Sequence, residues 1–269
     1  MIHPTAIINP NAKIDKSVEI GPYVVIGEDV NIGKNTKIGA HAYIEYSTIG
    51  ENCSISQSVC LGTPPQDFKY KNKKTLAIIG NNCTFREFAT VHRGSMTDAT
   101  RIGDNCYFMA YSHAAHDCVF GKEVVMANCA SVGGHVFLDD YCIVGGLVAI
   151  HQFCKIGKLC MLGGGTIVTM DVPPYTLACG DRVKLHGLNV VGLKRRNFSL
   201  DTIKKIKSAY KLLFMSKKPL SEALVELEFI NKDNRMYDKE VENLINFIKS
   251  SKRGVCPPQR IKGVVHQIT

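Results

Sequence analysis

The stretch IGPYVVIGEDVNIGKNTKIGAHAYI, residues 20–44, places isoleucine at every sixth position. Neither an α-helix, with a period of 3.6, nor an isolated strand, with a period of 2, produces a sustained period of six. A coil of three short straight sides does, if each side turns one apolar residue inward. Eighteen residues then make one coil, and stacked coils form a parallel β-helix. Glycine often follows the inward residue, and we expect it to supply a turn at positive φ.

The six-residue period continues through most of the first 170 residues, with a one-residue slip before Ile49. Its apolar members are Ile2, Ile8, Ile14, Ile20, Ile26, Ile32, Ile38 and Ile44, then Ile49, Ile55 and Leu61, then Ile79, Phe85 and Val91, and finally Ile102, Phe108, Ala114, Phe120, Met126, Val132, Leu138, Val144, Ile150, Ile156, Leu162 and Val168. At 45% apolar content, twelve successive matches in the last run are far beyond chance.

The position two residues before each of these is also expected to point inward and to be small. It is cysteine at Cys53, Cys83, Cys106, Cys118, Cys142, Cys154 and Cys160. Seven of the eleven cysteines are therefore interpreted as buried thiols that fill the core. Because no secretory leader is evident, we expect a cytoplasmic protein without disulfides.

Two segments interrupt the period and are predicted to leave the coil wall, at residues 62–77 and 93–101. The period ends at DVPPY, residues 171–175, where two prolines are expected to disrupt strand pairing. Helical spacing follows, with Ser199 as a candidate N-cap and further helices near 220–230 and 239–250. We therefore predict two domains, a β-helix over residues 1–190 and an α-helical domain over residues 191–269.

The charge of the chain is divided unevenly along its length. Residues 1–181 hold 14 Lys and Arg against 16 Asp and Glu, whereas residues 182–269 hold 19 against 8. A C-terminal excess of this kind suits an acidic partner, such as nucleic acid, a membrane surface, a phosphate ligand or an acidic protein. Solvated lysine-rich helix faces are the alternative explanation.

Counting in steps of eighteen brings distant polar residues together on one strip of the wall. His116 is predicted to stack with Gly134 and Gln152, Asp117 with His135, and Ala115 with Gly133 and His151. With His113, these positions form one cluster, and none of its polar members occupies an inward position. We therefore expect a ridge that points outward: His113, His116, Asp117, His135, His151 and Gln152.

Clustered titratable groups indicate acid–base or metal chemistry. A mixed Cys/His metal site is excluded if the cysteines face inward, while an all-histidine site stays open. The preferred interpretation makes His116 a general base oriented by Asp117 or another carboxylate, with the backbone N–H groups of Gly133 and Gly134 available to a developing oxyanion. This combination favours acyl transfer. Since no serine or outward cysteine adjoins His116, we expect the acceptor to attack directly.

The motifs QDFKY (66–70), HRG (92–94), AHDC (115–118), GGHV (133–136), HQFC (151–154), DVPPY and GLNVVGLKRRNFS (187–199) together resemble the UDP-N-acetylglucosamine 3-O-acyltransferase family, which begins lipid A biosynthesis. The resemblance implies a left-handed β-helix that forms a homotrimer, with active sites between adjacent subunits. It implies an (R)-3-hydroxyacyl donor on acyl carrier protein, UDP-N-acetylglucosamine as acceptor, and no cofactor or metal. It implies that the protein neither binds nucleic acid nor inserts stably into a membrane.

The resemblance also assigns roles to residues. His116 matches the base for the sugar 3-hydroxyl, assisted by Asp117, and Gly134 matches the oxyanion donor. Gly164 matches a position associated with acyl length. The residues that match the substrate cleft are Asp67, Lys69, His113, His135, His151 and Gln152, and those toward the nucleotide are Asn189, Arg195 and Arg196. Position 191 is valine where well-known members carry glutamate, which leaves a 3-amino acceptor open.

Three further interpretations remain. One is the N-acyltransferase of the same pathway, which carries an additional N-terminal uridine-binding domain, whereas the period here begins at Ile2. Another is a γ-type carbonic anhydrase with histidine-bound zinc. The last is a non-catalytic β-helical scaffold.

Overall fold

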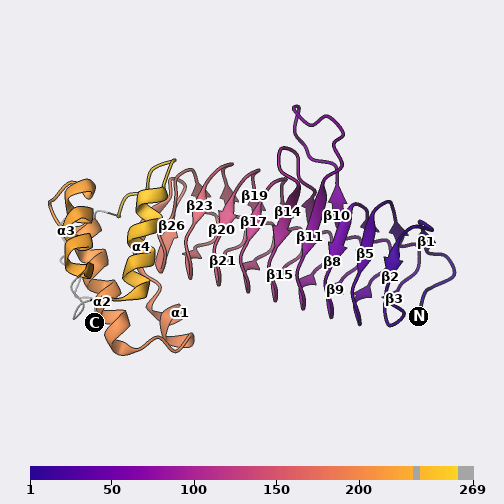
Figure 1. The fold of residues 1–269 in the computed structure, drawn as a ribbon, viewed down its shortest axis with the longest axis horizontal. Coiled ribbons are helices and arrows are strands. Elements are labelled where there is room, and N and C mark those ends of the chain that lie inside the picture. The colour runs from indigo at the N-terminus through magenta and orange to yellow at the C-terminus, as the bar shows by residue number, and fades with distance from the viewer. Residues whose placement is uncertain (233–236, 260–269) are drawn as a thin grey trace.

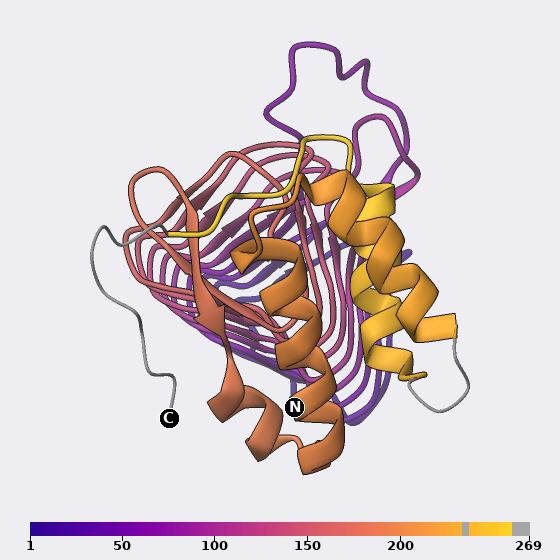
Figure 2. The same ribbon diagram turned by 90° about the vertical axis from the view of Figure 1, so that its left-hand side faces the viewer.

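The chain folds into a long parallel β-helix that carries a group of helices at its C-terminal end (Figure 1). The computed structural model describes residues 1–232 and 237–259. Three sheets of nine, eight and ten strands run along the β-helix. Seen along the axis, they enclose a triangular prism, and two loops project from one of its corners (Figure 2).

Each sheet is named here after its first strand, and almost every strand is two to four residues long. The β1 sheet contains β1 (Ile7–Ile8), β4 (Val25–Ile26), β7 (Tyr43–Ile44), β10 (Cys60–Thr63), β13 (Thr90–His92), β16 (His113–Ala114), β19 (Ser131–Val132), β22 (Ala149–Ile150) and β25 (Ile167–Val168). The β2 sheet contains β2 (Lys13–Ile14), β5 (Val30–Ile32), β8 (Ser47–Ile49), β11 (Leu76–Ile79), β14 (Ala99–Ile102), β17 (Val119–Phe120), β20 (Phe137–Leu138) and β23 (Lys155–Ile156). The β3 sheet contains β3 (Glu19–Ile20), β6 (Lys37–Ile38), β9 (Ser54–Ile55), β12 (Thr84–Phe85), β15 (Tyr107–Phe108), β18 (Val125–Met126), β21 (Ile143–Val144), β24 (Met161–Leu162), β26 (Thr176–Cys179) and β27 (Lys184–Leu188).

The predicted register is confirmed. Ala114 pairs with Val132, and Val132 pairs with Ile150, so successive coils are eighteen residues apart. The one-residue slip appears where Ile32 pairs with Ile49. The inward residues from Ile20 onward form one continuous apolar core.

The expected role of the glycines is wrong. In most turns the positive φ falls on the third residue, as in Tyr23 at 57° and Asn35 at 57°, and not on the glycine directly after the inward residue; Gly62, at 74°, follows the expectation. A Cβ at Gly33 would lie 2.7 Å from the carbonyl carbon of Gly50 in the next coil. Glycine is therefore required because neighbouring coils approach closely there.

The two ends of the β-helix also differ from expectation. Ile2 is 51% exposed because it lies in the first coil, at the end of the stack. At the other end, Pro173 and Pro174 do not stop strand pairing, since they precede β26, which still pairs in parallel with β24. The strand β27 then pairs antiparallel with β26 and closes the sheet.

The seven cysteines predicted to face inward are all buried, and all eleven cysteines of the chain are free thiols. Burial raises the pKa of the Cys118 thiol to about 12. These thiols therefore behave as small apolar core groups.

The C-terminal part contains α1 (Val190–Arg195), α2 (Leu200–Tyr210), which continues as a π-helical turn η1 (Lys211–Met215), α3 (Leu220–Lys232) and α4 (Lys239–Ser250). Ser199 caps α2 as predicted, because its side chain accepts a hydrogen bond from the backbone N–H of Thr202. Among the described residues, none of the helices combines the length and apolar character needed to span a bilayer. Helix α4 is tied to the β-helix through Glu240, which accepts hydrogen bonds from Tyr175 and Lys158.

The two predicted excursions are shorter than expected, residues 64–75 and 93–98, because β10, β11 and β14 extend into their ends. Both loops connect the β1 sheet to the β2 sheet, so both leave the same edge of the prism. Arg93 holds the longer loop against the wall by donating to Gly62 O at 2.8 Å and Tyr70 Oη at 3.0 Å, and by an ion pair with Glu45.

Candidate active site

The turns that connect the β1 sheet to the β2 sheet carry most of the predicted site residues. We call this row of turns, residues 115–117, 133–135 and 151–153, with the two loops above it, the covered edge. His116 lies in the first turn, Gly134 directly below it in the next and Gln152 in the third, as the eighteen-residue count predicts. The ridge is not open, however, because the loops leave His116 only 8% and Asp117 only 6% exposed.

His116 and Asp117 form a hydrogen-bonded dyad. The Nδ1 atom of His116 lies 2.7 Å from Oδ2 of Asp117. A carboxylate accepts only, so this contact places the imidazole proton on Nδ1. The Nε2 atom of neutral His116 is then unprotonated and able to take a proton.

Asp117 is held by several donors from the shorter loop. Its Oδ1 atom accepts hydrogen bonds from the backbone N–H groups of Ser95 at 3.0 Å and Thr97 at 2.8 Å, and from the Thr97 hydroxyl at 2.6 Å. Its Oδ2 atom also accepts from the N–H of Met96 at 3.2 Å. Burial alone would raise the pKa of Asp117, but the hydrogen bonds from His116, Thr97 and Met96 outweigh it and hold that pKa well below its usual range. Asp117 is therefore a fixed anion.

Gly134 lies against the imidazole of His116. A Cβ at this position would lie 2.6 Å from Cε1 and 2.8 Å from Nε2 of His116, so no side chain fits. The Gly134 carbonyl accepts from Phe153 N, whereas its own N–H has no hydrogen-bond acceptor among the described residues. A free backbone donor thus lies beside the free ring nitrogen.

Three more histidines surround the dyad. His135 packs edge-on to His116, stacks on Phe153, and places Nε2 3.4 Å from Oδ2 of Asp117. His113 is hydrogen-bonded through Nδ1 to Thr90 Oγ1 at 2.7 Å. His92, which belongs to the HRG motif but was not predicted as a site residue, packs edge-on to His113 and is buried. Burial, and then the nearby charges of His113, His116 and Arg93, lower the pKa of His92 to about 4.

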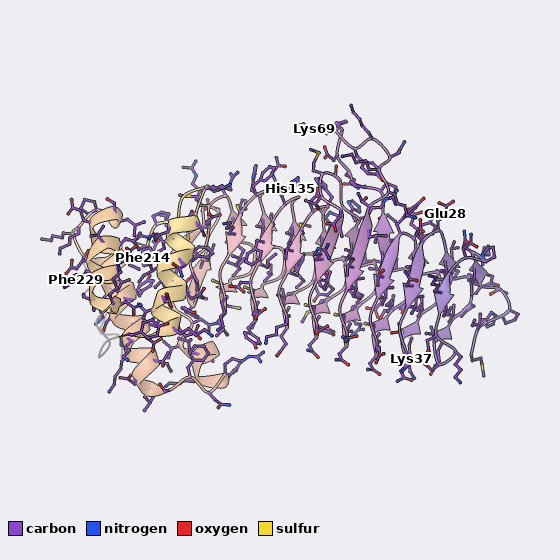
Figure 3. All side chains as sticks on the ribbon, viewed as in Figure 1. Glu28, Lys37, Lys69, His135, Phe214 and Phe229 are labelled. Atoms are coloured by element: carbon purple, nitrogen blue, oxygen red, sulfur yellow. The ribbon has the colours of Figure 1, made fainter. Side chains whose placement is uncertain are left out.

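The other predicted cleft residues of this edge lie around the dyad with more exposure. Asp67, in the longer loop, accepts a hydrogen bond from Ser95 Oγ at 2.6 Å, which is the main reason that its pKa is lowered. Lys69 is exposed on the same loop, which rises from the side of the β-helix where His135 lies (Figure 3). His151 and Gln152 are exposed one coil beyond Gly134.

The remaining predicted residues lie on the other two edges of the prism. Gly164 follows β24, in a turn between the β3 and β1 sheets. Asn189, Arg195 and Arg196 line a cavity of about 540 Å³ between α1 and the β3 sheet. A single chain therefore does not bring these four residues to His116.

Within that cavity, Arg196 pairs with Glu123 and lies 4.1 Å from the ring centre of Tyr141. The side chain of Asn189 is used structurally, since it caps α1 at Gly192 N and donates to Leu159 O at 2.9 Å. Arg195 and Val191 are exposed at the cavity.

The described residues contain one cluster with ligand atoms near enough to share a metal ion, formed by His116, Asp117 and His135 within 4.8 Å of one another. The shortest contact in it, 2.7 Å between His116 Nδ1 and Asp117 Oδ2, is a hydrogen bond, and an ion would have to replace its proton. Hydrogen bonds explain the geometry of His116 and Asp117, and stacking on Phe153 explains that of His135.

The sequence did not identify Ser95, Thr97 and Thr100 as site residues. Ser95 and Thr97 donate hydrogen bonds to the Asp117 carboxylate, and the Thr100 hydroxyl accepts one from the Asp117 backbone N–H. The signal was present in GSMTDAT, residues 94–100, a short run of small hydroxyl residues inside an interruption of the period. Such residues favour hydrogen bonds to nearby backbone and carboxylate groups.

Comparisons with known proteins place the whole chain in a family. The family model described as Udp N-acetylglucosamine O-acyltransferase, domain 2, matches residues 171–256, and that of the GMPPB C-terminal domain matches residues 1–91. The acyl-[acyl-carrier-protein]–UDP-N-acetylglucosamine O-acyltransferase of Thermodesulfovibrio yellowstonii is 50% identical over 80% of this chain and 83% of its own. The Burkholderia lata protein of the same name is 44% identical over 77% and 80%.

Solved structures of relatives share the fold. The Francisella novicida UDP-N-acetylglucosamine acyltransferase superposes with a TM-score of 0.91 at 34% identity, covering 99% of both chains. The Campylobacter jejuni enzyme gives 0.89 at 38% identity, over 97% of this chain and 100% of its own. The prism is thus the left-handed β-helix of these structures. The chain is an acyltransferase and belongs to the acyl-[acyl-carrier-protein]–UDP-N-acetylglucosamine O-acyltransferase family.

Proposed function

We propose that the protein transfers an (R)-3-hydroxyacyl group from acyl carrier protein to the 3-hydroxyl of UDP-N-acetylglucosamine, as the first step of lipid A biosynthesis in the cytoplasm. The names of the relatives specify the acyl carrier and the sugar nucleotide. The observation that carries the proposal for this chain is the dyad. Asp117 accepts a hydrogen bond from Nδ1 of His116, so Nε2 stays unprotonated and lies beside the free N–H of Gly134.

In the first step, Nε2 of His116 removes the proton of the sugar 3-hydroxyl as the oxygen attacks the thioester carbonyl carbon. The imidazolium that forms is stabilised by the Asp117 anion, 2.7 Å away. The negative charge that develops on the carbonyl oxygen is stabilised by the N–H of Gly134.

In the second step, the tetrahedral intermediate collapses, the carbon–sulfur bond breaks and the His116 imidazolium returns its proton to the leaving thiolate. The products are the 3-O-acyl sugar nucleotide and the free thiol of the carrier. Because the thioester supplies the activated acyl group, the reaction needs no cofactor.

In this proposal Asp67, Lys69, His113, His135, His151 and Gln152 bind substrate around the dyad, Asn189, Arg195 and Arg196 bind the nucleotide, and Gly164 sets acyl length. Since the last four lie on other edges, a complete site requires a second copy of the chain. We propose the homotrimer expected for the family, with each site between adjacent subunits. The C-terminal excess of lysine and arginine is placed to attract the acidic carrier protein.

The test is an assay with purified protein, a series of 3-hydroxyacyl carrier proteins, and either UDP-N-acetylglucosamine or its 3-amino analogue, read by mass spectrometry. We expect acylation of the 3-hydroxyl sugar, and His116→Ala to lower kcat about 10² to 10⁴-fold with an unchanged melting temperature. Faster acylation of the 3-amino analogue would show that the analogue, and not UDP-N-acetylglucosamine, is the preferred acceptor. An active His116→Ala protein would refute the mechanism.

A further inference from the structure

We infer that the loop 93–98 is a positioning element, in which Thr97 fixes the dyad carboxylate and Ser95 couples that carboxylate to Asp67 of the neighbouring loop. This inference rests on the proposed function and extends it to two residues that do not touch the reacting atoms. It is drawn from the hydrogen bonds of three side chains, Thr97, Ser95 and Asp67.

Thr97 makes two of the contacts to Oδ1 of Asp117, through its hydroxyl at 2.6 Å and its backbone N–H at 2.8 Å. Its hydroxyl also lies 3.1 Å from Ala99 O, but its one proton goes to the nearer, charged carboxylate oxygen. Hydrogen bonds to an ionised group are stronger than neutral ones. Thr97 therefore restrains the rotation of Asp117 about its side-chain bonds, and with it the orientation of the His116 ring.

Ser95 uses two atoms for two carboxylates. Its backbone N–H donates to Asp117 at 3.0 Å, and its hydroxyl donates to Asp67 at 2.6 Å. Ser95 is 2% exposed, so its bond to Asp117 is shielded from water, whereas its bond to Asp67 is partly shielded. Ser95 therefore fixes Asp67, which is proposed to bind the sugar, relative to the carboxylate that orients His116.

The two residues should affect different steps. Thr97 acts on the orientation of the base, which matters when the proton is transferred, whereas the Ser95 hydroxyl acts on Asp67, which is proposed to bind the sugar. Loss of the Thr97 hydroxyl should lower kcat, and loss of the Ser95 hydroxyl should raise KM for the sugar nucleotide.

The experiment measures kcat, KM for UDP-N-acetylglucosamine and melting temperature for Thr97→Val, Thr97→Ser and Ser95→Ala, with His116→Ala as reference. Thr48→Val, an outward position of β8 on the β2 sheet, is the matched control for losing a threonine hydroxyl. We expect Thr97→Val to lower kcat about tenfold with little change in KM, and Thr97→Ser to restore it within about twofold. Ser95→Ala should raise KM about fivefold and change kcat less.

A Thr97→Val protein with wild-type kcat, measured beside an inactive His116→Ala protein, would overturn the inference and leave the proposed function intact. Equal losses in Thr97→Val and Thr97→Ser, accompanied by a lower melting temperature, would assign the loop a purely structural role and also overturn it. Full activity of His116→Ala would instead remove the proposed function on which the inference rests.

Discussion

The covered edge and the edge between the β3 and β1 sheets have the same backbone and different surfaces. Both place a residue with positive φ at the third position of each turn, such as His135 at 59° and Leu147 at 59°. On the covered edge two loops bury His116 and Asp117, and Phe153, two coils further along, is 51% exposed. In the single chain Leu147 is 71% and Tyr111 59% exposed on the other edge. The repeat supplies equivalent turns on both edges. The two loops inserted on one edge make a site where side chains are fixed and shielded from water.

Glycine at the second turn position offers the strongest test of this comparison. At Gly134 a Cβ would overlap the His116 ring, 2.6 Å from Cε1, whereas at the equivalent Gly146 the nearest atom is Asn128 O at 3.4 Å. We expect Gly134→Ala to lower kcat at least about 10²-fold, because the base must move and the free N–H is displaced. Gly146→Ala should fold normally and lose far less activity. Equal losses in the two variants would show that the edges do not differ in this way.

Burial of histidine on the covered edge should appear in the pH dependence of stability. The pKa of His92 is lowered to about 4 from an ordinary value of 6.5, so the unfolded chain binds the proton more tightly. The stabilisation is complete above pH 6.5 and is lost as the pH falls toward 4, by about 3 kcal/mol in total and by about 2 kcal/mol between pH 7.5 and pH 5. Urea unfolding at pH 7.5 and pH 5 should show this loss, and His92→Gln should reduce it.

The exposed His186 of β27 provides the matched control, since it lies away from the covered edge. His186→Gln should leave the difference between pH 7.5 and pH 5 as in the unmodified protein. If His92→Gln did the same, burial by the loops would not be the source of the pH dependence.

The smallest expected effect concerns Lys69, which is exposed on the longer loop. Lys69→Ala should raise KM for the sugar nucleotide about threefold, with an effect that fades at high salt, because exposed charges are screened. Lys37, which Figure 3 shows on the opposite side of the β-helix, is the control and should leave KM unchanged when replaced by alanine. An equal change for both lysines would indicate a general effect of charge.

The sequence predicted the coil because one inward residue in six is a requirement that every coil repeats. The same count placed Gly134 beneath His116 without any structural information. It could not predict that the ridge is covered, since loops 64–75 and 93–98 interrupt the period and follow no repeat. It also misassigned the glycines, because the contact of Gly33 with the next coil depends on three-dimensional spacing.

The nucleotide-side residues show another limit of the count. Asn189, Arg195 and Arg196 lie beyond the repeats, and nothing in their spacing indicates that α1 returns to a different edge from that of His116. The antiparallel strand β27, which sets the position of α1, was not predicted either.

The central claim is that Asp117 keeps the His116 proton on Nδ1 and leaves Nε2 free to act as the base. Nitrogen-15 NMR of the histidine rings at pH 8, with the His116 signals assigned from a His116→Gln sample, measures this directly. We predict a protonated Nδ1 and an unprotonated Nε2 in the free enzyme. A His116 ring protonated on Nε2 instead would contradict the account.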